Sequence, residues 1–124
     1  MFSIDDVNVI LDEIADEFPT ELFNGLNGGV SLLDETRFSE ADPNGGLYTL
    51  GEYRYDQMGR YIVLYYGSIL AVHGRDPLSV FKRNLKKLLS HELTHHIESL
   101  AGERGLEIED ARKLGEFLRL SEEK

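Results

Sequence analysis

The stretch "DPLSVFKRNLKKLLSHELTHHIESLAG", residues 76–102, predicts one long helix. Asp76 followed by Pro77 is a favourable helix start, because Asp caps free backbone N–H groups and Pro needs no partner at the first helical position. Gly102 is a suitable stop at the other end. Between them, apolar residues recur at steps of three and four, the spacing of one helix face. That face consists of Phe81, Leu85, Leu88, Leu89, Leu93, Ile97 and Leu100.

The segments around this helix predict two further helices and a small set of strands. An apolar stripe with helical spacing at residues 4–18 ends at Pro19, and a similar pattern covers residues 108–120. Residues 30–33 form a short apolar run, and residues 47–56 and 60–70 are rich in β-branched and aromatic residues, which favours paired strands. The Pro and Gly residues of 39–46 indicate an exposed loop. The pattern predicts an α+β fold.

Composition narrows the class of protein. A chain of 124 residues fits one domain, which we expect to span residues 1–124. Its formal net charge of -10 would repel a phosphate backbone and disfavours nucleic-acid binding. The sequence contains no cysteine, so any zinc must be held by His and carboxylate side chains. It has neither a signal-peptide pattern at the N-terminus nor an apolar run long enough to span a bilayer. We therefore expect a cytoplasmic protein that is not bound to membranes.

The central helix carries the motif HExxH at residues 91–95. On a helix His91 and His95 lie one turn apart, so their imidazoles can converge on one metal ion. Glu92 lies beside such an ion, where its carboxylate can hold a water molecule and act as general base. His96 lies on another side of the helix and is expected to be a packed residue, and His73 is expected to be a solvated loop residue.

A catalytic zinc usually has three protein ligands and one open position. Without cysteine, the third ligand is expected from the acidic residues downstream of the motif. The segment "ERGLEIED" at 103–110 can turn the chain back over the site. An acidic first turn stabilised by the helix dipole would explain the same cluster without a metal. The candidates are Asp110, which ranks first, followed by Glu109, Glu107, Glu103 and Glu98.

The motifs "LGEYRYD", "RYIVLYYGSIL" and "HELTHH", followed by "IEDARKL", resemble the small bacterial zincin-like metallopeptidase family. The resemblance covers roughly residues 45–115. It implies a minimal zincin-like fold, in which a small mixed sheet packs on the active-site helix between an N-terminal and a C-terminal helix. In many relatives the motif reads HExxHxxGxxD, whereas this chain has a longer spacer and Glu98 at the position of the Gly. Matching the acidic pair carries the role of third ligand to Asp110.

The expected activity is zinc-dependent hydrolysis of a peptide or protein substrate. The metal ligands would be His91, His95 and Asp110, and Glu92 would take the proton of the attacking water. An extended peptide could add to an exposed sheet edge, expected at residues 61–69, where Gly67 allows close approach. Tyr65, Tyr66 and His73 are candidates for stabilising the oxyanion, although strand packing also explains the tyrosines.

Two other functions fit the same residues. The chain can be a non-catalytic zincin-fold module that binds a protein partner, or a domain in which zinc is purely structural and joins the last helix to the histidine helix. An open coordination position would favour the enzyme over both. The sequence leaves the oligomeric state unknown.

Overall fold

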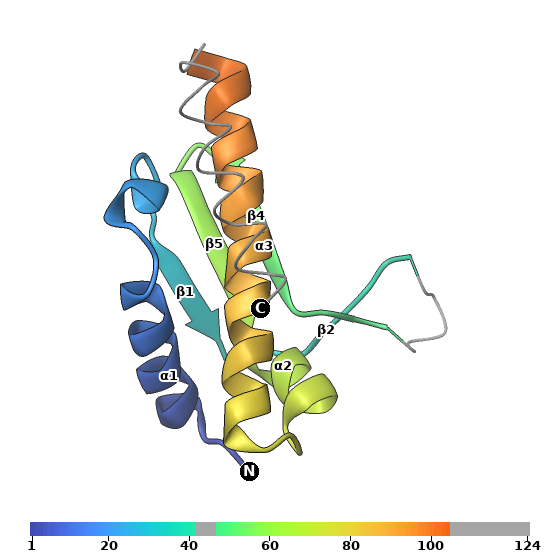
Figure 1. Ribbon diagram of the computed structural model, residues 1–124. Helices are drawn as coiled ribbons and strands as arrows, with labels where there is room; N and C mark the ends of the chain where they lie inside the picture. The colour runs from blue at the N-terminus through green and yellow to red at the C-terminus, as the bar shows by residue number, and fades with distance from the viewer. Residues whose placement is uncertain (42–46, 105–124) are drawn as a thin grey trace.

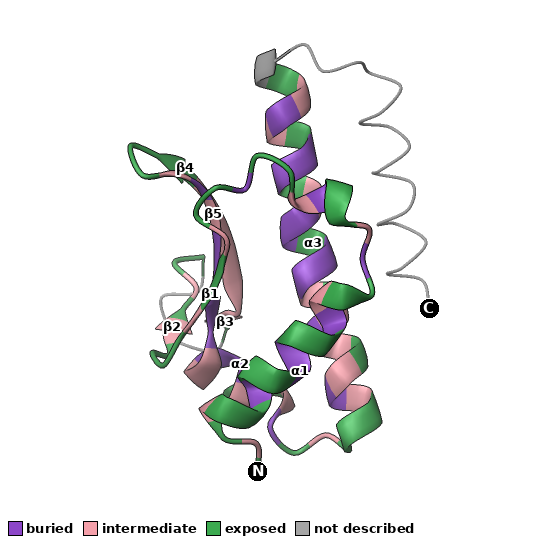
Figure 2. Ribbon diagram, turned by 90° about the vertical axis from the view of Figure 1, so that its left-hand side faces the viewer, coloured by how far each residue is buried: buried purple, intermediate pink, exposed green. Residues whose placement is uncertain are grey.

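The protein is an α+β fold in which helices cover one face of a three-stranded sheet. The computed structural model describes residues 1–41 and 47–104. Figure 2 shows α1 and α3 on the same side of the sheet. The predicted helix at residues 108–120 and most of the loop at 39–46 lie outside the described residues. In chain order the elements are α1 (Ile4–Asp16), the 3-10 helix η1 (Thr20–Phe23), β1 (Val30–Leu33), β2 (Arg37–Phe38), β3 (Tyr48–Thr49), β4 (Gly51–Asp56), β5 (Gly59–Tyr65), α2 (Tyr66–His73) and α3 (Leu78–Arg104).

The sheet is mixed, and β5 is its central strand. The strand order is β1-β5-β4, with β1 parallel and β4 antiparallel to β5 (Figure 1). β4 and β5 form a hairpin in which Asp56 lies opposite Gly59. Gly59 has a φ of 97°, a conformation that glycine adopts at little cost. The short strands β2 and β3 form a separate antiparallel pair.

The strand predicted at residues 60–70 is wrong in its second half. The strand β5 ends at Tyr65, and residues 66–73 form the helix α2 instead. This helix is tied to the chain that follows β1: the N–H of Gly67 donates to the carbonyl of Glu35, and the Ser68 hydroxyl accepts from the N–H of Arg37 at 2.8 Å and donates to its carbonyl at 3.0 Å. These bonds join segments about thirty positions apart, so the local pattern of aromatic and branched residues does not reveal them.

Helix α3 is the longest helix among the described residues. It begins at Leu78, directly after Pro77, and runs to Arg104, so the predicted stop at Gly102 is wrong. A glycine in an exposed part of a helix costs only about 1 kcal/mol relative to alanine, which does not end a helix of this length. None of the described helices combines the length and the apolar character needed to cross a membrane.

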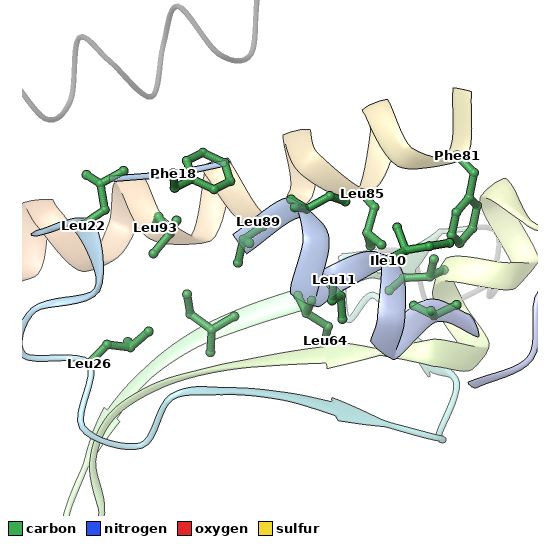
Figure 3. Close-up of a cluster of buried hydrophobic side chains, with 14 of the residues drawn as sticks. Ile10, Leu11, Phe18, Leu22, Leu26, Leu64, Phe81, Leu85, Leu89 and Leu93 are labelled. Atoms are coloured by element: carbon green, nitrogen blue, oxygen red, sulfur yellow. The ribbon is translucent and has the colours of Figure 1, made fainter. Parts of the chain in front are cut away.

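The apolar core lies between the sheet and the two long helices, as Figure 3 shows. Ile62 and Leu64 of β5 point into it and are fully buried. Helix α1 begins with a capping box, in which Ser3 and Asp6 satisfy each other's backbone N–H groups. The helices contribute Val7, Ile10, Leu11 and Ile14 from α1, and Phe81, Leu85, Leu89, Leu93 and Ile97 from α3. The stripes that predicted these helices are therefore their buried faces.

The close contact of α2 with the preceding loop gives a testable prediction. A Cβ atom added at Gly67 would overlap the Thr36 hydroxyl oxygen and lie 3.0 Å from the Thr36 backbone nitrogen. We expect Gly67→Ala to lower the free energy of unfolding by about 1–3 kcal/mol, because the loop must move to admit a methyl group. Urea unfolding followed by circular dichroism measures this. In the matched control, Gly102→Ala, the added Cβ meets nothing within 4 Å. Equal stability of the two variants would contradict the prediction.

Candidate metal centre

His91 and His95 lie side by side on the exposed surface of α3. Their Nε2 atoms are 3.2 Å apart, and the ring planes are inclined at 86° with centroids 4.7 Å apart. Both side chains are exposed. The helix brings the two rings together because the residues are one turn apart, as the motif predicts.

The spacing of the two Nε2 atoms fits a tetrahedral zinc ion. Zinc binds imidazole nitrogen at about 2.0–2.1 Å, and two such bonds at a tetrahedral angle separate the nitrogens by about 3.3 Å. The measured 3.2 Å is close to that value. The separation of the two nitrogens is therefore compatible with a shared ion.

Glu92 lies between α3 and the sheet, with a side chain that is buried. Burial raises the pKa of its carboxyl group, and the nearby charge of Glu52 raises it further. His95 and a hydrogen bond from the backbone N–H of Tyr53 act in the opposite direction. Glu92 thus points toward β4, while the two imidazoles beside it face solvent.

Strand β4 borders a cleft beside the histidines. The cleft has a volume of about 510 Å³ and is lined by Gly51, Glu52, Tyr53, His91, Glu92 and His95. The prediction that residues 61–69 form the sheet edge is wrong, because β1 and β4 flank β5 on its two sides. The carbonyl of Leu50 accepts from the N–H of Tyr65. In an antiparallel pair, successive residues turn their backbone N–H and C=O groups alternately toward the partner strand and away from it. Leu50 bonds with β5, so the backbone groups of Gly51 and Tyr53 point away from β5, toward an edge that pairs with no other strand among the described residues.

Glu52 connects the cleft to two arginines. Its carboxylate lies 2.7 Å from Arg54 and 3.5 Å from Arg37. Although burial opposes it, the hydrogen bond and charge of Arg54, together with the charge of Arg37, hold the pKa of Glu52 below its usual value. Its negative charge at the rim of the cleft is therefore balanced by cations.

A third side chain that could complete the predicted metal site is not found in the described part of the chain. Among residues 1–41 and 47–104, no group of three or more His, Asp or Glu side chains is placed to hold a metal ion. Glu98 is described and exposed, but it does not join His91 and His95. Asp110, Glu109 and Glu107 lie outside the described residues, and the side chain of Glu103 is not described.

Neither of the other two histidines lies in the cleft. His96 is fully buried, as expected for a packed residue, and bonds with Tyr53 and the carbonyl of Asn24. His73 ends α2 and is partly buried rather than solvated in a loop. Its Nδ1 is 3.2 Å from the Asp76 carboxylate, which also accepts from Asn84. His73 therefore belongs to the corner between α2 and α3.

The two tyrosines proposed for oxyanion stabilisation also lie elsewhere. The hydroxyl of Tyr66 donates to the carbonyl of Phe2 at 2.6 Å. Tyr65 is buried on the face of the sheet opposite α3, with the Arg37 guanidinium 4.8 Å from its ring centre. Packing, the other explanation considered for these residues, describes both.

Glu52 and Tyr53 are cleft residues that the sequence did not single out. The alternation in "LGEYRYD" places Gly51, Tyr53 and Tyr55 on one face of a strand, which was a usable signal. The alternation does not show that this strand is the sheet edge or that the edge lies beside the histidines. The cleft residues of β4 could therefore not be predicted from it.

Comparisons with known proteins find a solved relative of similar size. No family model and no curated protein matches the sequence. The chain is similar to the solved structure of a conserved hypothetical protein from Thermus thermophilus, with 30% sequence identity and a TM-score of 0.67. The match covers 81% of this chain and 98% of that one.

Proposed function

The chain belongs to the family of the conserved hypothetical protein from Thermus thermophilus, and we propose that it is a zinc-dependent metallopeptidase with a zincin-like fold. The observation that carries the proposal is the pair of Nε2 atoms 3.2 Å apart on His91 and His95, with Glu92 next to them in the cleft. This is the arrangement in which a helix supplies two ligands and a general base from one turn.

The residues divide the work between binding and proton transfer. His91 and His95 would hold the zinc, with Asp110 as the proposed third ligand. When bound, zinc supplies Lewis-acid chemistry and makes a water molecule acidic enough to react near neutral pH. Glu92 would take a proton from the attacking water and pass it to the leaving amine. A carboxylate whose pKa is raised by burial is a stronger base than an exposed one, which suits this role.

A peptide suits the cleft because, within the described part of the chain, β4 has an edge that no other strand pairs with. The outward backbone groups of Gly51 and the outward carbonyl of Tyr53 can pair with an extended chain, as in other cases where a peptide adds a strand to a sheet. Such a peptide would run past Glu92 and the two imidazoles. Support for this substrate class comes from β4 being both the sheet edge and the wall of the cleft.

The first test is the metal content of the purified protein. We expect about one zinc per chain by mass spectrometry, and loss of that zinc in His95→Ala because the variant keeps only two of the three proposed ligands. The matched control is His73→Ala, which removes a partly buried histidine that does not line the cleft and should leave the zinc in place.

Absence of zinc after incubation with excess metal would contradict the proposal. Bound zinc without cleavage of any peptide in a mixed pool would favour a binding module. Unfolding on chelation, together with absence of cleavage, would favour a structural ion, because such an ion contributes folding free energy directly.

A further inference from the structure

A chain of hydrogen-bonded polar groups, most of them buried, joins β4 and β5 to α3 beside the cleft. The guanidinium of Arg60 donates to the Tyr53 hydroxyl at 3.1 Å, and that hydroxyl lies 2.9 Å from Nδ1 of His96. His96 is 0% exposed and Arg60 is 3% exposed. Arg60 also donates to Ser99 on α3, and its guanidinium lies over the ring of Tyr55.

The carbonyl of Asn24, at the end of this chain of hydrogen bonds, determines which group donates in each bond. Nε2 of His96 lies 2.8 Å from the carbonyl of Asn24, and a carbonyl can only accept, so Nε2 carries a proton. In the neutral ring Nδ1 then accepts from the Tyr53 hydroxyl, which in turn accepts from Arg60. Each group donates to the next one, from Arg60 to Asn24.

Such a network stabilises the fold less than apolar side chains of similar size would. Buried polar groups add little net stability even when every partner is present, and an unpaired one costs about 1–3 kcal/mol. An apolar residue at position 53 or 96 would avoid that risk. What the polar groups add is a defined position: the hydroxyl of Tyr53 sets the distance between β4 and α3 at the residue following His95.

The backbone of Tyr53 lines the cleft, whereas its hydroxyl bonds with Arg60 and His96. Gly51, Tyr53 and Glu92 line the same cleft, and the outward N–H of Tyr53 donates to the carboxylate of Glu92. The side chain therefore anchors the strand at the point where its backbone meets the carboxylate.

We propose that Tyr53 is a positioning residue, held by Arg60 and His96, whose backbone N–H orients the Glu92 carboxylate toward the imidazoles of His91 and His95. The inference rests on the proposed function, since orientation of Glu92 matters for hydrolysis only if Glu92 is the general base. The geometric part, which links the anchor to the carboxylate, can be tested without turnover.

The test compares Tyr53→Phe with Tyr66→Phe. Both variants lose one tyrosine hydroxyl that makes a hydrogen bond, but the Tyr66 hydroxyl bonds with Phe2, away from the cleft. We expect Tyr53→Phe to speed amide exchange at position 53 at least tenfold, while the amides of Ile62 and Leu64 in β5 change less than twofold. Zinc affinity should change less than threefold, because His91 and His95 remain. If peptides are cleaved, kcat should fall at least tenfold with KM nearly constant. Tyr66→Phe should change none of these.

A second variant keeps the test decisive if loss of the hydroxyl disturbs folding. Glu92→Ala leaves the network intact and removes only the acceptor of the Tyr53 N–H, so it should also speed exchange at position 53 at least tenfold. Exchange within twofold of wild type in either variant would overturn the proposal, because the anchor requires an effect of Tyr53→Phe and the hydrogen bond requires an effect of Glu92→Ala. Faster exchange in both variants, with no peptide cleaved by the wild type, would uphold the anchor and reject the metallopeptidase, so the two failures are distinguishable.

Discussion

Glu92→Gln is expected to lower kcat for peptide hydrolysis by about 10²–10⁴-fold while zinc stays bound, because positioned proton transfer contributes about that factor. Glutamine has nearly the size of glutamate, and its carbonyl can still accept from the N–H of Tyr53. It cannot take a proton from water. The measurement combines steady-state kinetics on a cleaved peptide with zinc content by mass spectrometry.

The control for this substitution is Glu13→Gln. Glu13 lies on α1, is exposed and pairs with Lys82 at 3.2 Å, away from the cleft. The same chemical change there should leave both kcat and zinc content unaltered. A Glu92→Gln protein that keeps its zinc and cleaves peptides as fast as wild type would refute the assigned mechanism.

Phe81→Ala is expected to have the largest effect on stability. Phe81 lies in the first turns of α3, is 0% exposed, and stacks on Phe2 with ring centres 4.2 Å apart. Loss of a buried phenylalanine side chain costs about 3–5 kcal/mol, a large part of the roughly 5–15 kcal/mol that stabilises a typical domain. Urea unfolding followed by circular dichroism gives this value.

Leu78→Ala is the matched variant on the same helix. Leu78 is 50% exposed at the start of α3, so its truncation should change the free energy of unfolding by no more than about 0.5 kcal/mol. If Phe81→Ala were as stable as Leu78→Ala, the core described above would be incorrect.

The helices and the paired histidines could be predicted because they depend on near neighbours in the chain. The apolar spacing in α1 and α3 marks the faces that the structure buries. The approach of His91 and His95 follows from one turn of helix, and so does the different direction of Glu92. The hairpin between β4 and β5 likewise forms from adjacent segments. The residues that define the metallopeptidase proposal are all of this local kind, apart from Asp110.

The wall of the cleft depends on contacts between distant segments, and these only the folded chain decides. β5 became central because Val30–Leu33, about thirty positions earlier, pairs with it in parallel and leaves β4 at the edge. His96 joins Tyr53 across 43 positions and Asn24 across 72. Local periodicity contains no information about which distant strand pairs or which hydroxyl meets a buried ring, since the same pattern is compatible with several packings. The motif thus places the two proposed ligands and the proposed base, while tertiary packing decides which strand edge lies beside them and which contacts hold that edge in position.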